Sequence, residues 1–179
     1  MGFGVRLVLV VAIAVTTAGC FQPLYSEQPL VGGPAVATAL GNVDILQIDA
    51  PTGTDDARIA VEVRNDLLFG LQGGNGGGSP THSLKIRLTP SRYPIIQDFQ
   101  TARASSELYG LTASYQLTDL RTGTVVLNAS TTSRVSYDIP GEQQRFARAR
   151  GLRDAESRAA QVIADNIRAR LASYFVAGS

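Results

Sequence analysis

Apolar and polar residues alternate through Tyr109-Gly110-Leu111-Thr112-Ala113-Ser114-Tyr115-Gln116-Leu117-Thr118. A period of two places the apolar side chains on one face of a strand and the polar side chains on the other. Residues 119–123 have the composition of a turn, and residues 125–137 alternate in the same way. The sequence therefore predicts a long antiparallel hairpin with one buried face.

The opposite face of this hairpin consists mostly of hydroxyl and amide side chains and has little charge. Its second segment carries Asn128, Ser130, Thr132, Arg134 and Ser136 on that face. One interpretation is a sheet surface that faces solvent. The other is a surface that contacts a large partner, because small hydroxyl side chains lose little conformational entropy when they become ordered. The sequence leaves both interpretations open.

A strand and a helix are expected before the hairpin. Residues 43–48 are rich in β-branched residues and predict a short strand. Residues 52–56 supply capping hydroxyls and early acidic residues, which favour the start of a helix. The apolar stripe of this helix recurs every fourth residue, at Ile59, Val63, Leu67 and Leu71. We interpret the glycine-rich run 73–78 as a connector that ends the helix, because phosphate-binding loops follow a strand and open a helix.

The next segment alternates again over residues 84–89 and predicts a further strand, which we expect Pro90 to end. Residues 91–104 combine strand formers with Pro94 and Asp98, and we interpret them as a long connection.

Residues 145–176 predict a final helix, with Gly151 as a point of interruption. Its expected apolar stripe is Ala155, Ala159, Val162, Ile163, Ile167, Leu171 and Tyr174. Four arginines, at positions 145, 148, 150 and 153, stand near its start, where cations are less favoured than at a helix end.

The N-terminus has the features of an export signal. Arg6 precedes an apolar run over residues 7–15, which is shorter than the about 20 residues of a membrane-spanning helix. Ala18-Gly19-Cys20 is similar to the end of a bacterial lipobox, and Cys20 is the only cysteine. We therefore expect residues 1–19 to be a lipoprotein signal peptide and Cys20 to be acylated. The alternative is ordinary signal cleavage, which leaves a free thiol.

The mature chain divides into a tether and one domain. Residues 20–42 contain several prolines and glycines and predict an extended, lipidated tether. Residues 43–179 then form a single α+β domain. By resemblance to Gram-negative lipoproteins, Phe21 after the cysteine favours the outer membrane.

Composition and motifs exclude several function classes. Without Arg6 the chain has 15 basic and 15 acidic residues, which argues against a nucleic-acid binder that works by bulk charge. His82 is the only histidine and is expected to pack at the surface or against a loop. Asp55 and Asp56 already have a structural role in the first turn of a helix. No residue cluster has metal-ligand spacing, so the sequence predicts no enzyme, no metal and no cofactor.

The order of these features resembles the LptE family, the small lipoproteins of the outer-membrane lipopolysaccharide translocon. Cys20 followed by Phe21-Gln22-Pro23-Leu24-Tyr25 is similar to the opening of alphaproteobacterial members. Residues 113–126 resemble the hairpin of the family, and the alanine-spaced helix from Phe146 to Phe175 resembles its last helix. The chain departs from the family in lacking a glycine after Cys20 and in its long glycine loop.

The resemblance implies a four-stranded, mostly antiparallel sheet with two helices packed on one face, in the order β-α-β-β-β-α. It implies a lipid-anchored outer-membrane protein that faces the periplasm and plugs the LptD β-barrel. There it would help the barrel to assemble and lipopolysaccharide to reach the outer leaflet. Family members are also thought to bind lipopolysaccharide through basic residues. By chemistry, our candidates for phosphate contact are Arg103, Arg134, Arg148 and Arg150.

A second hypothesis is a free-standing lipoprotein that binds a small lipid or other ligand in a cleft between helices and sheet. This hypothesis predicts a sizeable apolar pocket, and a filled core would contradict it.

Overall fold

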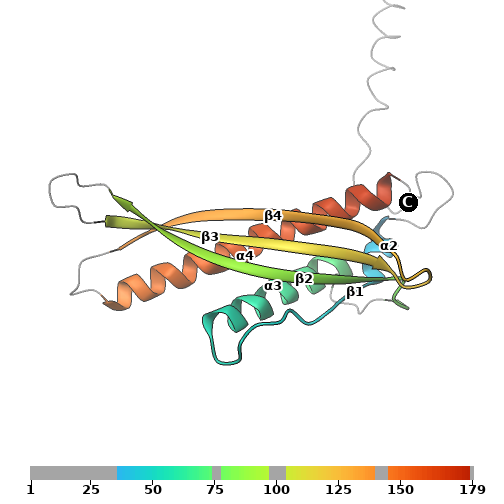
Figure 1. Cartoon of the computed structure of the whole chain (residues 1–179), viewed down its shortest axis with the longest axis horizontal. Coiled ribbons are helices and arrows are strands. Elements are labelled where there is room, and N and C mark those ends of the chain that lie inside the picture. Colours follow the sequence, from blue (N-terminus) through green and yellow to red (C-terminus); the bar gives the residue numbers. More distant parts are fainter. Residues whose placement is uncertain (1–35, 74–77, 97–103, 140–144, 178–179) are drawn as a thin grey trace, which may run out of the picture.

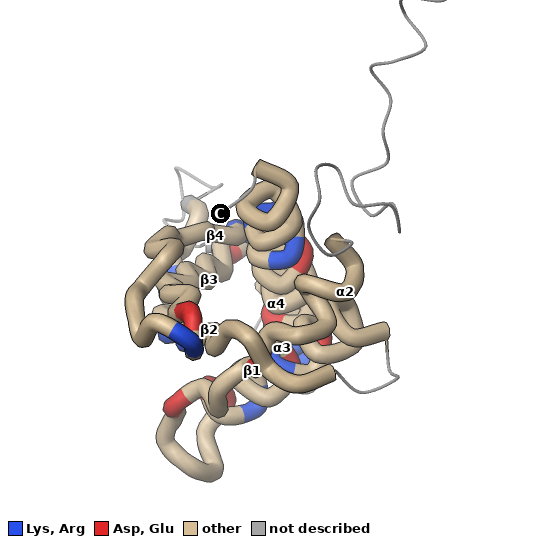
Figure 2. The backbone as a smooth tube through the Cα atoms, turned by 90° about the vertical axis from the view of Figure 1, so that its right-hand side faces the viewer, with Lys and Arg blue, Asp and Glu red and all other residues tan. Residues whose placement is uncertain are grey.

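The computed structural model describes residues 36–73, 78–96, 104–139 and 145–177. The predicted signal peptide, Cys20 and Arg103 lie outside the described residues. The elements are α2 (Val36–Gly41), β1 (Val43–Ile45), α3 (Asp55–Gln72), β2 (His82–Ile96), β3 (Ala104–Asp119), β4 (Val125–Asp138) and α4 (Arg145–Val176). They form two layers, with the strands on one side and the helices on the other (Figure 1). Figure 2 shows the same two layers end on. The predicted α+β class is confirmed.

The sheet has the strand order β1-β2-β3-β4. The first pair is parallel and the other two are antiparallel, so the sheet is mostly antiparallel as predicted. β1 pairs only over Val43–Ile45, whereas β2 and β3 pair along almost their full length. The predicted hairpin is confirmed as β3 and β4, with a bulge between the pairs Leu117↔Leu127 and Thr118↔Val125.

The prediction of an extended tether over residues 20–42 is wrong for residues 36–41, because they form the helix α2. Its two apolar side chains, Val36 and Leu40, are buried in the core. Burial against α3 and α4 stabilises this single turn and a half, which would be too short to persist as an isolated helix.

The prediction that Pro90 ends its strand is also wrong, because β2 continues through Pro90 and Pro94 to Ile96. The carbonyl of Leu84 points towards β1, where it accepts a hydrogen bond from the Leu46 amide at 3.0 Å. Pairing with β3 stays in register from His82 to Ile95. Pro90 and Pro94 are at even positions like Leu84, so their nitrogens point to the β1 side of β2, away from β3. β1 has ended there, and no ladder hydrogen bond is lost.

α3 begins and ends as its sequence predicts. Thr54 is the N-cap, and its hydroxyl accepts a hydrogen bond from the Ala57 amide at 3.2 Å. Gly73 ends the helix in the left-handed conformation with φ 61°, and its amide donates to the Phe69 carbonyl. Asp55 and Asp56 lie in the first turn, as expected.

α4 is a continuous helix of 32 residues, so the predicted interruption at Gly151 is wrong. A side chain at Gly151 would lie 3.6 Å from Tyr137 Cδ2 and 3.7 Å from the Asp138 carbonyl, where the helix passes the end of β4. Packing along the helix outweighs the cost of about 1 kcal/mol of one interior glycine. Ala155, Ala159 and Ala160 are fully buried against the sheet and α3. Val162 was predicted in this stripe but is 43% exposed, because it lies beside the buried face.

A carboxylate is buried where α3, α4 and β2 meet. Glu156 of α4 is 1% exposed and forms ion pairs with Arg58 of α3 and Arg92 of β2. Burial raises the pKa of Glu156, and the charge of Arg58 opposes this shift. Tyr109 of β3 is buried beside it, and burial together with the charge of Glu156 raises the pKa of Tyr109. This ionic group joins both long helices to the sheet.

Candidate ligand-binding face of the sheet

The outer face of the sheet is the surface turned away from α3 and α4, and none of the elements described covers it (Figure 1). Strand register brings its side chains together in rows that cross three strands. Three of these rows are Lys85–Gln116–Asn128, Arg87–Ser114–Ser130 and Thr89–Thr112–Thr132. The first two rows each combine one cation with hydroxyl or amide groups.

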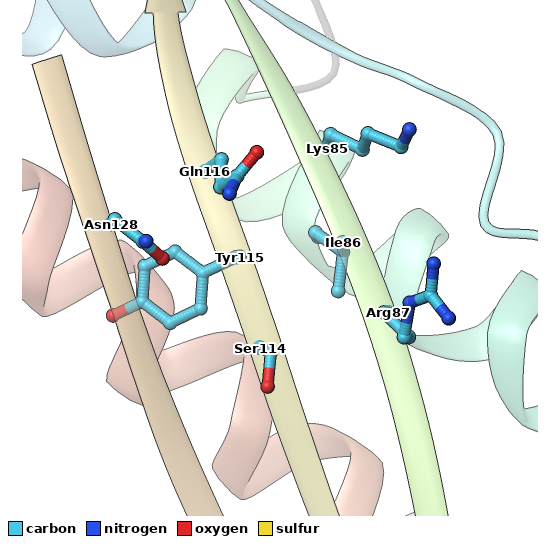
Figure 3. A pocket seen from close by; sticks show the side chains of 7 residues that line it. All are labelled: Lys85, Ile86, Arg87, Ser114, Tyr115, Gln116 and Asn128. Carbon is cyan, nitrogen blue, oxygen red and sulfur yellow. The ribbon is translucent and has the colours of Figure 1, made fainter. Parts of the chain in front are cut away.

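A depression of about 180 Å³ lies over these two rows. Figure 3 shows Lys85 and Arg87 on β2, Ser114 and Gln116 on β3, and Asn128 on β4. Side chains two residues apart on a strand lie about 7 Å apart, so the ammonium and guanidinium groups can contact one ligand. Cations with neutral hydrogen-bond donors beside them suit an anion with several oxygens, such as a phosphate.

The neighbouring part of the outer face is held in place by side-chain contacts. The hydroxyls of Thr112 and Thr132 lie 3.1 Å apart, and the Ser91 hydroxyl donates to the Gly110 carbonyl at 3.3 Å. A Cβ atom on Gly110 would lie 2.5 Å from the Ser91 hydroxyl, so the glycine makes room for this contact.

The outer face becomes apolar towards the end of the sheet where β2 leads to β3. Tyr93 is 57% exposed and pairs in register with Leu108, which is partly buried. Ile95, two residues after Tyr93, is half-buried on the same outer face of the sheet. The face therefore has a cationic half and an apolar end, an arrangement that suits an amphiphile.

Of the four predicted arginines the structure describes three, Arg134, Arg148 and Arg150, and it does not bring these three together in one site. Arg134 is exposed on the outer face, in the row of Ser91 and Gly110. Arg148 lies on α4, and its guanidinium donates a hydrogen bond to the Glu107 carboxylate at 2.8 Å. Glu107 is on the inner face of the sheet. Arg150 is exposed on α4.

Glu107 has a second partner in Tyr137, whose hydroxyl donates to it. Burial and this hydrogen bond raise the pKa of Tyr137 to about 12. Arg148, which was proposed for phosphate contact, is thus part of an ionic contact between α4 and the inner face of the sheet.

The residues that line the depression were missed as candidates by sequence reasoning. Lys85 is the only lysine of the chain and alternates with buried Leu84 and Ile86, which would have placed it on the outer face. Its partners Gln116 and Asn128 are about 30 and 40 residues away in sequence and meet it only through strand register.

His82 was expected to pack at the surface or against a loop, and it instead packs half-buried against the last turn of α4. Its ring meets Phe175 edge on, with centroids 5.2 Å apart, and Thr81 lies within hydrogen-bond distance of Nδ1. Burial lowers its pKa. Within the described ranges there is no group of three or more residues that could hold a metal ion, and none of the helices is long and apolar enough to cross a membrane.

The chain is similar in fold to several solved bacterial proteins. A lipoprotein of Caulobacter crescentus CB15 has a TM-score of 0.61 at 19% identity, and the match covers 80% of this chain and 97% of that one. A minor lipoprotein of Acinetobacter baumannii has a TM-score of 0.53 at 16% identity, with 75% and 92% covered. Rare lipoprotein B of Shewanella oneidensis has a TM-score of 0.53 at 12% identity, with 75% and 96% covered. None of the curated protein sequences matches the chain.

The family comparison agrees with the fold. The model of the family LptE, described as lipopolysaccharide-assembly, matches residues 40–171, which include every strand and both long helices up to Leu171. Because this match spans well over half of the chain, the chain belongs to the LptE family of lipopolysaccharide-assembly proteins.

Proposed function

We propose that this chain is a lipid-anchored protein of the outer membrane that plugs an LptD-type β-barrel and contacts lipopolysaccharide there. Its family membership supports the general role in lipopolysaccharide assembly. In this proposal Cys20 is acylated, the domain faces the periplasmic side, and the chain performs no catalysis.

The proposal that the chain contacts a barrel and lipopolysaccharide is supported by the outer face of the sheet. It is long, uncovered by the described helices, and built mostly from small hydroxyl and amide side chains. Such a face can contact the polar interior of a barrel with little loss of side-chain entropy. Its depression holds Lys85 and Arg87, which would bind phosphate groups of lipopolysaccharide, while Tyr93 and Leu108 offer apolar contact to its acyl part.

Arg134 belongs to the same proposal because it extends the cationic surface along β4. Arg103, Arg148 and Arg150 remain proposals of the sequence analysis. Among them, Arg148 would have to leave Glu107 before it could bind a phosphate group.

The alternative of a lipid held between helices and sheet has little space. The pocket between α3 and the inner face, lined by Ile59, Leu88, Leu111 and their neighbours, has a volume of about 100 Å³. Ligand pockets for drug-sized molecules have about 300–1,000 Å³, so the filled core favours the plug proposal.

The test is to purify the full chain from outer membranes and to measure the barrel and the lipopolysaccharide that accompany it. We expect the wild type to carry both. The double variant Lys85→Glu/Arg87→Glu should retain the barrel but lose about tenfold or more of its lipopolysaccharide, since about 1.4 kcal/mol of lost charge-assisted contact corresponds to that factor.

Arg121→Glu is the matched control, because Arg121 is an exposed cation in the β3–β4 turn, away from the depression. Wild-type chain that purifies without a barrel would contradict the plug. Equal lipopolysaccharide on the double variant and on Arg121→Glu would contradict the role of the depression.

A further inference from the structure

β4 has a strand on only one side. The sheet order places β3 beside it and no described strand beyond it (Figure 1). The Leu84 carbonyl points to β1, so the odd residues of β2 direct their backbone groups to β3. Register pairs these residues with even residues of β3, and it pairs odd residues of β3 with odd residues of β4. The even residues of β4 therefore direct their N–H and C=O groups away from the sheet.

The β4 edge is the row of outward backbone groups that belong to Asn128, Ser130, Thr132 and Arg134. Among the described residues, none forms a hydrogen bond with these groups. One step further along β4, the Ser136 carbonyl accepts a hydrogen bond from Arg158 of α4 at 3.5 Å, which agrees with the outward direction of the even residues. A row of unpaired donors and acceptors of this kind is a template for another strand.

The opposite margin of the sheet is closed to pairing. Beyond β1, Pro90 and Pro94 of β2 face outwards with nitrogens that cannot donate a hydrogen bond. Proline at an edge is one of the ways in which natural proteins prevent the addition of a strand. β4 has 14 residues and no proline, so this margin of the described sheet keeps a continuous row of donors and acceptors.

α4 supplies an apolar contact beside the β4 edge. Asn166 of α4 donates to the Thr131 hydroxyl at 3.1 Å, and Arg158 contacts Ser136, so one face of the helix follows β4. Val162 lies on this helix face, one turn from each of them, and is 43% exposed. Apolar side chains of β4 that point to the same inner side are only partly buried, namely Leu127, Ala129 and Val135. A strand added to β4 would cover them with every second side chain.

The outer side of the β4 edge carries a cation without a partner. The charged side chains that β2, β3 and β4 direct to the outer face are Lys85, Arg87, Arg134 and Asp138. Arg134 forms no ion pair or hydrogen bond with any described residue. Asp138 is four residues along the strand, about 13 Å away, and Gly110 stands opposite Arg134 on β3. A carboxylate on an added strand could therefore pair with Arg134 across the β4 edge.

We propose that the β4 edge binds an extended segment of a partner protein, which adds to the sheet beside β4. The segment places an aliphatic side chain against Val162 and an acidic side chain opposite Arg134. Backbone hydrogen bonds supply the affinity in this mode of recognition, and the alternating side chains supply the specificity. The added strand would lie about 14 Å from β2, so Lys85 and Arg87 stay open to an anion. The proposal does not rest on the proposed function.

The test uses the full chain in detergent and the labelled peptide Asp-Val-Thr-Val-Thr-Val-Asp. It spans about 23 Å, as Asn128–Arg134 does, and either strand direction brings one aspartate opposite Arg134. Fluorescence anisotropy measures the binding. We expect Thr132→Pro, which removes one donor from the β4 edge, to weaken binding about tenfold, or about 1.4 kcal/mol. Thr132→Val is the matched control, because it also loses the contact with the Thr112 hydroxyl but keeps the N–H, and it should bind as the wild type does.

A charge reversal tests the pair with Arg134 without changing the backbone. Arg134→Glu should bind the aspartate peptide about fivefold more weakly than the wild type does, since like charges directly opposite each other are destabilising. A peptide with lysine in place of both aspartates should show the reverse preference and bind Arg134→Glu more tightly than the wild type.

Hydrogen exchange followed by NMR locates the bound segment. The peptide should slow exchange at the outward amides of Asn128, Ser130, Thr132 and Arg134. The amides between them already pair with β3 and should not change. The proposal is overturned if the wild type does not bind, if Thr132→Pro binds as Thr132→Val does, if the charge preference does not reverse, or if protection does not alternate.

Self-association of the wild type that Thr132→Pro abolishes would also overturn it, because the occupant would then be a second copy of the chain. A failure of the barrel or the lipopolysaccharide to accompany the purified chain leaves all of these results unchanged, so the two proposals fail separately.

Discussion

Two tyrosines buried on the inner face of the sheet differ in what their hydroxyl groups contact. The Tyr137 hydroxyl donates to Glu107, which also binds Arg148. The Tyr109 hydroxyl is buried without a hydrogen-bond partner among the residues that the structure describes. A buried polar group without a partner costs stability, whereas one with a partner contributes to it.

Removing each hydroxyl should therefore have opposite effects on the free energy of unfolding. We expect Tyr137→Phe to lower it by about 1 kcal/mol, because a hydrogen bond to a carboxylate is lost. Tyr109→Phe should leave it unchanged or raise it. Urea unfolding followed by circular dichroism measures both, and the two variants serve as controls for each other. An equal loss in both would contradict the assignment of partners.

Single residues were predictable where their role is local. Thr54, Asp55 and Gly73 cap α3 through contacts within a few residues, so the sequence alone placed them correctly. Lys85 and Arg87 could be placed on a strand face, but the depression they form with Gln116 and Asn128 depends on register between three strands. No pattern within β2 contains that information.

At the scale of elements, the two prolines of β2 show why a strand was predicted too short. Proline ends a strand when its missing N–H belongs to a ladder, and the sequence does not reveal that β1 is only three residues long. Beyond Leu84 one side of β2 has no strand beside it, and both prolines point there. Gly151 was misread for a related reason, since contacts with β4 lie outside the local sequence.

The position of proline should therefore matter more than its presence. Pro94→Thr is expected to change the free energy of unfolding by less than about 0.5 kcal/mol, because no pairing depends on that nitrogen. Thr112→Pro places proline in β3, which pairs with strands on both sides, and should cost about 3 kcal/mol or more. Urea denaturation of both variants tests this contrast. A large loss from Pro94→Thr would contradict the conclusion that no pairing depends on the nitrogen of residue 94.

At the scale of the whole molecule, Glu156 connects α3, α4 and β2 through its two arginine partners. Hydrophobic periodicity predicted which face of each element is buried, and the arrangement of the sheet and the two long helices was expected from the family resemblance. This charged contact was not, because Arg58, Arg92 and Glu156 are far apart in sequence. Burial of a carboxylate also makes the stability of the domain depend on pH.

The sign of this dependence follows from the raised pKa of Glu156. The folded protein holds the proton more tightly than the unfolded chain, whose carboxyl has the ordinary pKa of 4.5. The stability contributed by the protonated group is therefore complete below pH 4.5 and is lost as the pH rises through the folded pKa. Relative to Glu156→Gln, the wild type should lose unfolding free energy as the pH rises from 4.5 through the raised pKa of the folded state. Urea unfolding of both proteins at several pH values and constant ionic strength measures this difference. If the stability of the wild type rises relative to that of Glu156→Gln as the pH rises, the prediction is contradicted.

The 32 residues of α4 have a consequence for the proposed setting of the protein. At about 1.5 Å per residue the helix is about 48 Å long, close to the about 40–45 Å of a bilayer with its headgroups. α2 and the C-terminal end of α4 lie together at one end of the molecule, and the β2–β3 end lies at the other (Figure 1). In the proposed setting, the two ends of the domain are therefore separated by about the thickness of one bilayer.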